Sequence, residues 1–168
     1  MTLLRLCLAL IAVTAPQLAL AQEMPAEYSA FMKAVERSGD FKDGVLKVNV
    51  PRNDLEVTIS GRPAPTPFGF GGWLAVTAGD GGMHVMMGDL VLTEAEVNPV
   101  MSALLDNGLE VTALHNHFFH EQPRIFYLHV HGAGTPDDLA RRARPALGLI
   151  GRPASPGTQS RTVAPARG

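Results

Sequence analysis

The sequence predicts an α+β fold in which an antiparallel sheet carries helices packed on one face. Short apolar runs bounded by glycine, proline and aspartate recur along the chain, as is typical of strands. Other segments place apolar residues at helical spacing. From residue 84 onward the predicted order is strand, helix, strand, strand, helix, so the C-terminal half is expected to be partly ferredoxin-like.

The first 21 residues have the pattern of a secretory signal peptide. Arg5 precedes an apolar run over residues 6–13, and small residues lead to the sequence Ala19-Leu20-Ala21, an A-x-A cleavage pattern. The apolar run is too short to span a bilayer, so we expect no stable membrane anchor after cleavage. We therefore expect cleavage after Ala21 and a periplasmic or secreted protein.

Composition narrows the possible ligands and partners. The single cysteine, Cys7, lies within the predicted signal peptide, which excludes a disulfide framework and thiolate metal ligands in the mature chain. The formal net charge is only -2 and no block of Lys or Arg occurs, so nucleic acid is not an expected partner. Residues 152–168 have almost no bulky apolar side chain and are predicted to be a disordered tail.

Residues 22–39 are expected to hold an N-terminal helix, and residues 40–151 a single domain. The helix covers residues 26–38 and ends at Gly39. The segment 61–72 contains several prolines and glycines and is predicted to be a loop. Strands are expected at residues 45–50, 55–59, 73–77 and 84–92.

The rest of the domain is predicted to be a helix, two strands and a final helix. Thr93 and Glu96 match a capping box, but Pro99 would then lie inside the helix. We therefore expect Asn98 to cap the helix, with residues 93–97 as a separate turn. Strands follow at residues 109–117 and 124–131, and Thr135 caps a last helix through residue 150.

Five of the six histidines fall between residues 115 and 131. In a strand, residues two apart share a face, so His115 lies beside His117, and His129 beside His131. A hairpin whose paired residue numbers sum to about 246 brings His115 opposite His131 and His117 opposite His129, with Cβ atoms about 5 Å apart. Four imidazoles could then bind one divalent ion, with His120 completing the shell, and zinc or copper is the expected metal.

Glu121 is a candidate general base beside a metal-bound water. Its alternative role is an ion pair with Arg124. Since Arg124 also occupies the place of the second histidine, the zincin motif H-E-x-x-H is excluded. The spacing from His115 to Glu121 matches the core of the first cupin motif, but no second cupin motif follows. A hydrogen-bonded or pH-sensing histidine cluster is the alternative to a metal site.

A methionine-rich segment precedes the histidines. Strand alternation places His84 and Met86 on one face, with Met83 and Met87 on the other, which favours core packing over a soft copper site. Asp89 either supports the histidine site or caps a bulge beside Gly88.

Three stretches carry a resemblance to a known family: GDLVLTEAEVNPVM at residues 88–101, EVTALHNH at 110–117 and YLHVHG at 127–132. In this order they resemble the LppY/LpqO family, also described as domain of unknown function 1259, over about residues 40–150. The resemblance implies an exported bacterial protein and no established activity. Family lipoproteins carry a lipid-attachment cysteine, which this chain lacks at the cleavage site, so a soluble periplasmic form is implied.

Three functional hypotheses follow. The first is an exported metal-binding protein with His115, His117, His129 and His131 as ligands. The second is a metal-dependent hydrolase with Glu121 as its base, acting on a small-molecule substrate. The third is a small-ligand-binding module without metal, whose pocket is lined by residues 61–72 and the histidines.

Overall fold

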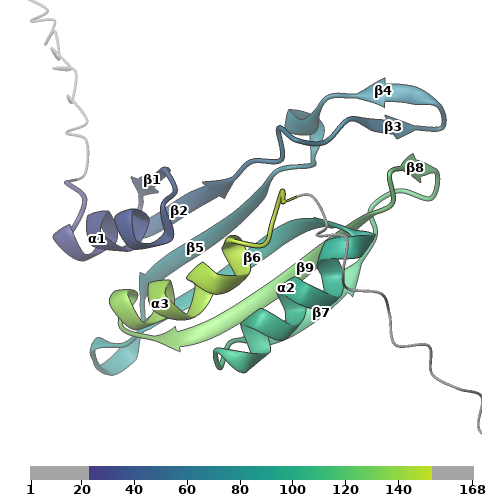
Figure 1. Cartoon of the computed structure of the whole chain (residues 1–168). Coiled ribbons are helices and arrows are strands. Elements are labelled where there is room, and N and C mark those ends of the chain that lie inside the picture. The colour runs from purple at the N-terminus through teal and green to yellow at the C-terminus, as the bar shows by residue number, and fades with distance from the viewer. Residues whose placement is uncertain (1–22, 153–168) are drawn as a thin grey trace, which may run out of the picture.

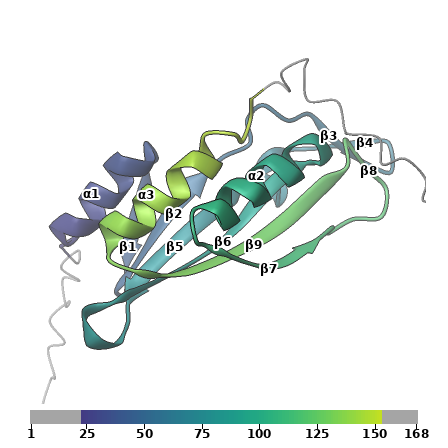
Figure 2. The ribbon, with the colours of Figure 1, turned by 60° about the horizontal axis from the view of Figure 1, so that its bottom comes forward.

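The computed structural model describes residues 23–152. The signal peptide predicted for residues 1–21, and the predicted tail apart from Arg152, lie outside this range. Three helices cover one face of a six-stranded antiparallel sheet, and a smaller three-stranded sheet stands at one end (Figures 1 and 2). The predicted α+β class is thus confirmed.

The large sheet has the strand order β1-β2-β5-β6-β9-β7. Strand β9 lies between β6 and β7 in the sheet, helix α2 follows β6, and helix α3 follows β9. The C-terminal half thus has the partly ferredoxin-like arrangement that the sequence predicts. The six strands are β1 (Gly39–Lys42), β2 (Val45–Val50), β5 (Gly72–Ala78), β6 (His84–Thr93), β9 (Ile125–Gly134) and β7 (Glu110–His115). The helices are α1 (Ala26–Val35), α2 (Glu94–Asp106) and α3 (Pro136–Leu147).

The core fills the space between the large sheet and the helices. Alternate strand residues such as Leu90 and Leu128 are fully buried there, against helix residues such as Val100 and Leu139. The opposite face of the sheet carries no helix (Figure 2). The odd-numbered residues of β9 lie on this open face, among them His129.

Helix α2 begins earlier than predicted. The expected start at Asn98 is wrong, because Thr93 and Glu96 form a complete capping box and Pro99 lies inside the helix. The Glu96 carboxylate also binds Arg52, whose Nη1 lies 2.9 Å from Oε2. This buried anchor and the apolar face of the helix outweigh the one backbone hydrogen bond that Pro99 removes.

Other boundaries also differ from the predictions. Helix α1 ends at Val35, whereas the predicted helix continued to residue 38. Glu36 adopts the left-handed conformation that ends the helix, and Gly39, the predicted helix end, is the first residue of β1. A Cβ atom on Gly39 would lie 2.3 Å from the Lys47 carbonyl oxygen, so this close strand pairing requires glycine. The predicted 61–72 loop contains a strand and a 3₁₀ turn. The additional elements are β3 (Val57–Ile59), β4 (Arg62–Ala64), η1 (Thr66–Phe68), η2 (Asp80–Gly82) and β8 (Glu121–Gln122).

The open, helix-covered sheet does not support the cupin comparison. Over residues 23–152, none of the helices is long and apolar enough to cross a membrane.

Candidate metal centre

The histidine-rich segments form an antiparallel pair, β7 with β9, as predicted, but the expected register is wrong. His115 pairs with Tyr127, and His131 pairs with Glu110. A register shift lies between Val111 and Ala113, and β8, within the connection, pairs with β3 of the small sheet. The connection is therefore not a symmetric turn, and the four imidazoles do not form two directly opposed pairs.

Two of the predicted ligands nevertheless meet on the open face. The Nε2 atoms of His115 and His129 lie 3.1 Å apart, and the two rings are nearly perpendicular, at 86°. The contact is a diagonal one, because His129 is two residues beyond Tyr127, the direct partner of His115. In the neutral state one ring donates its N–H to the lone pair of the other.

Asp89 supplies a carboxylate to this pair from the neighbouring strand. It pairs with His129 in the register of β6 and β9. Its Oδ1 atom lies 3.8 Å from His129 Nε2 and is buried without a hydrogen-bond partner among the described residues. Strand β6 pairs with β5 and β9 without a register shift at Gly88, so no bulge is present there for Asp89 to cap. His129 Nε2 thus lies within 3.8 Å of both a second imidazole nitrogen and a carboxylate oxygen.

His117 and Tyr127 form the wall of the site. The rings of His117 and Tyr127 are stacked, with centroids 3.4 Å apart at an angle of 10°. The buried Tyr127 hydroxyl donates to the Gly69 carbonyl oxygen at 2.9 Å, so the segment predicted as a loop reaches the site. Burial, with the nearby charges of Glu121 and Asp89, raises the pKa of Tyr127 well above its usual value of 10.0.

Glu121 is buried, with 4% of its surface exposed. Its Oε1 accepts a hydrogen bond from the Ile125 backbone at 3.2 Å, and its Oε2 has no partner among the described residues. Arg124 instead donates to Phe119 and Asn116. The alternative ion pair between Glu121 and Arg124 is therefore wrong.

The remaining histidines lie apart from the pair. His131 Nδ1 faces Glu110 Oε2 at 3.5 Å, farther along the open face. His120 is exposed in the connection, where its carbonyl oxygen accepts from Ser60. His84 lies at the start of β6, with its Nε2 3.3 Å from Glu27 Oε1.

The methionines divide between the two faces, as strand alternation predicts. Met86 is buried in the core, so core packing is confirmed for it. The same prediction is wrong for Met83 and Met87, which are 46% and 53% exposed.

Within residues 23–152, no three His, Cys, Asp or Glu side chains are arranged as a ready metal-binding group. In the His115–His129 pair with Asp89, the carboxylate Oδ1 lies 3.8 Å from His129 Nε2.

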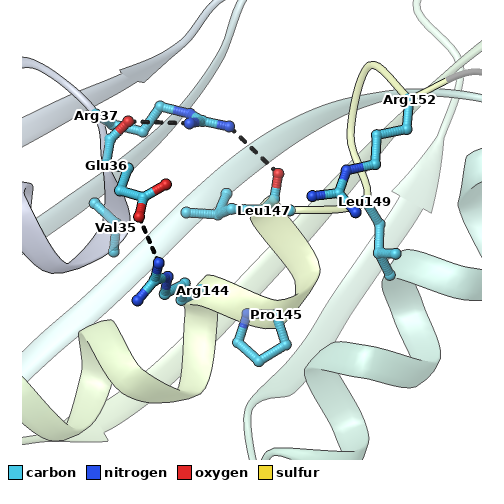
Figure 3. Close-up of a pocket in the computed structure, with 9 residues that line it drawn as sticks. Val35, Glu36, Arg37, Arg144, Pro145, Leu147, Leu149 and Arg152 are labelled. Atoms are coloured by element: carbon cyan, nitrogen blue, oxygen red, sulfur yellow. Dashed lines mark hydrogen bonds and ion pairs between the residues drawn. The ribbon is translucent and has the colours of Figure 1, made fainter.

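A cavity of about 360 Å³ lies away from the histidines, between the C-terminal ends of α1 and α3 (Figure 3). Arg37 donates to the carbonyl oxygens of Glu36 and Leu147, and Arg144 pairs with the Glu36 carboxylate. Because these cations satisfy groups at two helix ends, we assign them a structural role.

Fold and site together define an α+β protein with imidazoles and a carboxylate on the open face of its sheet. The chain belongs to the family described as Domain of Unknown Function (DUF1259), whose model matches residues 29–149. The resemblance predicted from the sequence is confirmed by this match. Comparison with curated proteins and with solved structures found no match.

Proposed function

We propose that this is an exported metal-binding protein whose ion is held by His115, His129 and Asp89. The observation that carries the proposal is the 3.1 Å separation of the two imidazole Nε2 atoms. Two nitrogens bound to one zinc at about 2.0–2.1 Å, in tetrahedral geometry, lie roughly 3.3 Å apart. The separation of the two nitrogens is thus close to that of two adjacent ligands, and the rings need to turn from their mutual hydrogen bond toward a shared ion.

The surroundings of the pair also favour a cation. Protonating both rings would bring two N–H groups face to face, with like charges together. Among the described residues Asp89 Oδ1 has no hydrogen-bond partner, and leaving a buried oxygen unpaired is costly. A divalent ion between the three side chains removes both penalties. Because Oδ1 lies 3.8 Å from His129 Nε2, a small rotation of Asp89 is needed to close the site.

Two imidazoles and one carboxylate leave part of a coordination shell open. This donor set suits zinc, and copper is the alternative. His117, whose ring centroid lies 5.2 Å from that of His115, is a candidate for a further ligand. Water or a small-molecule substrate takes the open position otherwise. Export rests on the signal-peptide pattern of the first 21 residues.

Zinc titration of the metal-free protein by calorimetry tests the proposal. His129→Ala is expected to weaken zinc binding by more than about tenfold, since even outer-shell changes cost 10–100-fold. His120→Ala is the matched control because His120 is an exposed histidine of the same segment. Equal affinities for the wild type and His129→Ala would refute the site.

A hydrolytic role is favoured by one observation: Oε2 of Glu121, near Tyr127, is buried and has no hydrogen-bond partner within residues 23–152. In this version the ion lowers the pKa of a bound water, and Glu121 accepts its proton. Turnover of p-nitrophenyl acetate by the zinc form, lost in Glu121→Gln while zinc binding persists, would support it. Equal turnover by both proteins would exclude Glu121 as the base.

A further inference from the structure

Met87 and His131 are neighbours outside the site described above. The thioether of Met87 is a soft metal ligand, and the imidazole of His131 is a borderline one. They are direct cross-strand partners in the register of β6 and β9. Directly opposed side chains have Cβ atoms about 5 Å apart. Both are accessible on the open face, since Met87 is 53% exposed and the His131 side chain 42% exposed.

The orientation of His131 leaves one nitrogen available as a ligand. Its Nδ1 faces Glu110 Oε2 at 3.5 Å, on the side away from Met87 in the strand order. A carboxylate at Nδ1 favours the tautomer with the proton on Nδ1 and the lone pair on Nε2. Metal-binding histidines commonly have such a carboxylate on the second nitrogen, where it fixes the ring and raises its basicity.

We propose that Met87 and His131 form a second metal site, selective for a soft monovalent ion of the Cu(I) type. Thioether and imidazole together select Cu(I), whereas zinc and other harder divalent ions bind thioether poorly. A site of two ligands on an open surface suits an ion of low coordination number. The carboxylate of Glu110 orients His131.

The second site adjoins the first. Met87 is two residues from Asp89 on β6, and His131 is two residues from His129 on β9. Two residues along a strand correspond to about 7 Å. The open face thus carries the proposed Met87–His131 site beside the proposed site of His115, His129 and Asp89. The proposal depends on Met87 and on the β6–β9 register, not on the His115–His129 contact, so either site can fail without the other.

Ag(I), an air-stable substitute for Cu(I), tests this site in chloride-free buffer. With ¹³C-methyl methionine labelling, the Met87 methyl signal is expected to shift on adding Ag(I), while that of buried Met86 stays in place. Met87→Leu is expected to lower Ag(I) affinity more than about tenfold and to leave zinc affinity unchanged. Met83→Leu, at the other exposed methionine, is the control and should bind like the wild type.

The expected pattern is a loss of Ag(I) binding in Met87→Leu alone. An unshifted Met87 methyl signal, or equal Ag(I) affinity of Met87→Leu and the wild type, would overturn the second site. Loss of zinc binding in His129→Ala together with a normal Met87 shift would support both sites. Absence of zinc binding in the wild type with a normal Met87 shift would reject only the first.

Discussion

Two buried glutamates provide a stability test of the reasoning about unpaired groups. Glu121 is 4% exposed and Glu96 is 8% exposed, so their burial is similar. Oε2 of Glu121 has no partner among the described residues. Both oxygens of Glu96, in contrast, accept hydrogen bonds from Arg52. Glu96 also accepts from Thr93 at 2.7 Å and from Gly151 at 2.7 Å.

The same substitution is therefore expected to have opposite signs at the two positions. Glu121→Gln keeps the acceptor for Ile125 and replaces an unpaired carboxylate oxygen with an unpaired neutral amide group. Because a buried unpaired charged group costs more than a neutral one, we expect a gain of about 1 kcal/mol in the free energy of unfolding. Glu96→Gln breaks a buried ion pair, and we expect a loss of about 3–5 kcal/mol.

Urea unfolding followed by circular dichroism at neutral pH, with a metal chelator present, measures both effects. The chelator matters because an ion at the site would change the surroundings of Glu121. If Glu121→Gln lost as much stability as Glu96→Gln, the account of its unpaired oxygen would be wrong. A gain in the stability of Glu121→Gln would also be consistent with a glutamate that is retained for function although it destabilises the fold.

Three further predictions concern pH and packing. The hydrogen bond from Arg52 lowers the pKa of Asp54 below its usual 3.8, so Asp54 stabilises the fold above that pH and less as pH falls through the lowered value. Asp54→Asn should therefore flatten the decline of urea stability below about pH 4. Burial raises the pKa of both tyrosines of the chain, Tyr28 and Tyr127. Their stabilising effect is present below pH 10 and lost as the pH rises through the raised values, so ultraviolet titration of the folded protein should show less tyrosinate at pH 10 than free tyrosine does. At Gly88 a Cβ atom would lie 2.8 Å from a backbone oxygen of β5, and Gly88→Ala should cost about 1–3 kcal/mol by urea unfolding.

Local sequence patterns predicted the strands and their faces well. The period of two placed His129 and His131 on one face of their strand, and Met86 and Met87 on opposite faces of theirs, as the structure has them. The capping signals of Thr135 and Pro136 likewise located the start of α3. These signals depend only on residues close together in the sequence, so they can be recognised without the tertiary structure.

The register of the histidine strands could not be predicted in the same way. It depends on the irregularity between Val111 and Ala113, and on the pairing of β8 with β3, about sixty residues earlier in the chain. A symmetric hairpin was the simplest assumption, and it misplaced His131 and His117. The position of Asp89 beside His129 depends on the order of the neighbouring strands, which only the folded sheet provides.

The buried ion pair was missed for a similar reason. Arg52 lies in a polar turn of the sequence and gives no local sign of burial. Its partner Glu96 is 44 residues away and was interpreted only as part of a capping box. Ion pairs between residues far apart in the sequence can be identified only when the tertiary packing is known.

Metal analysis of the protein, purified without an affinity tag, tests the central claim most directly. The wild type is expected to contain stoichiometric zinc or copper at the His115–His129 pair. The double variant His115→Ala/His129→Ala is expected to lose that ion, while His120→Ala retains it. A wild type without stoichiometric metal, or a double variant that keeps its zinc undiminished, would contradict the proposed site.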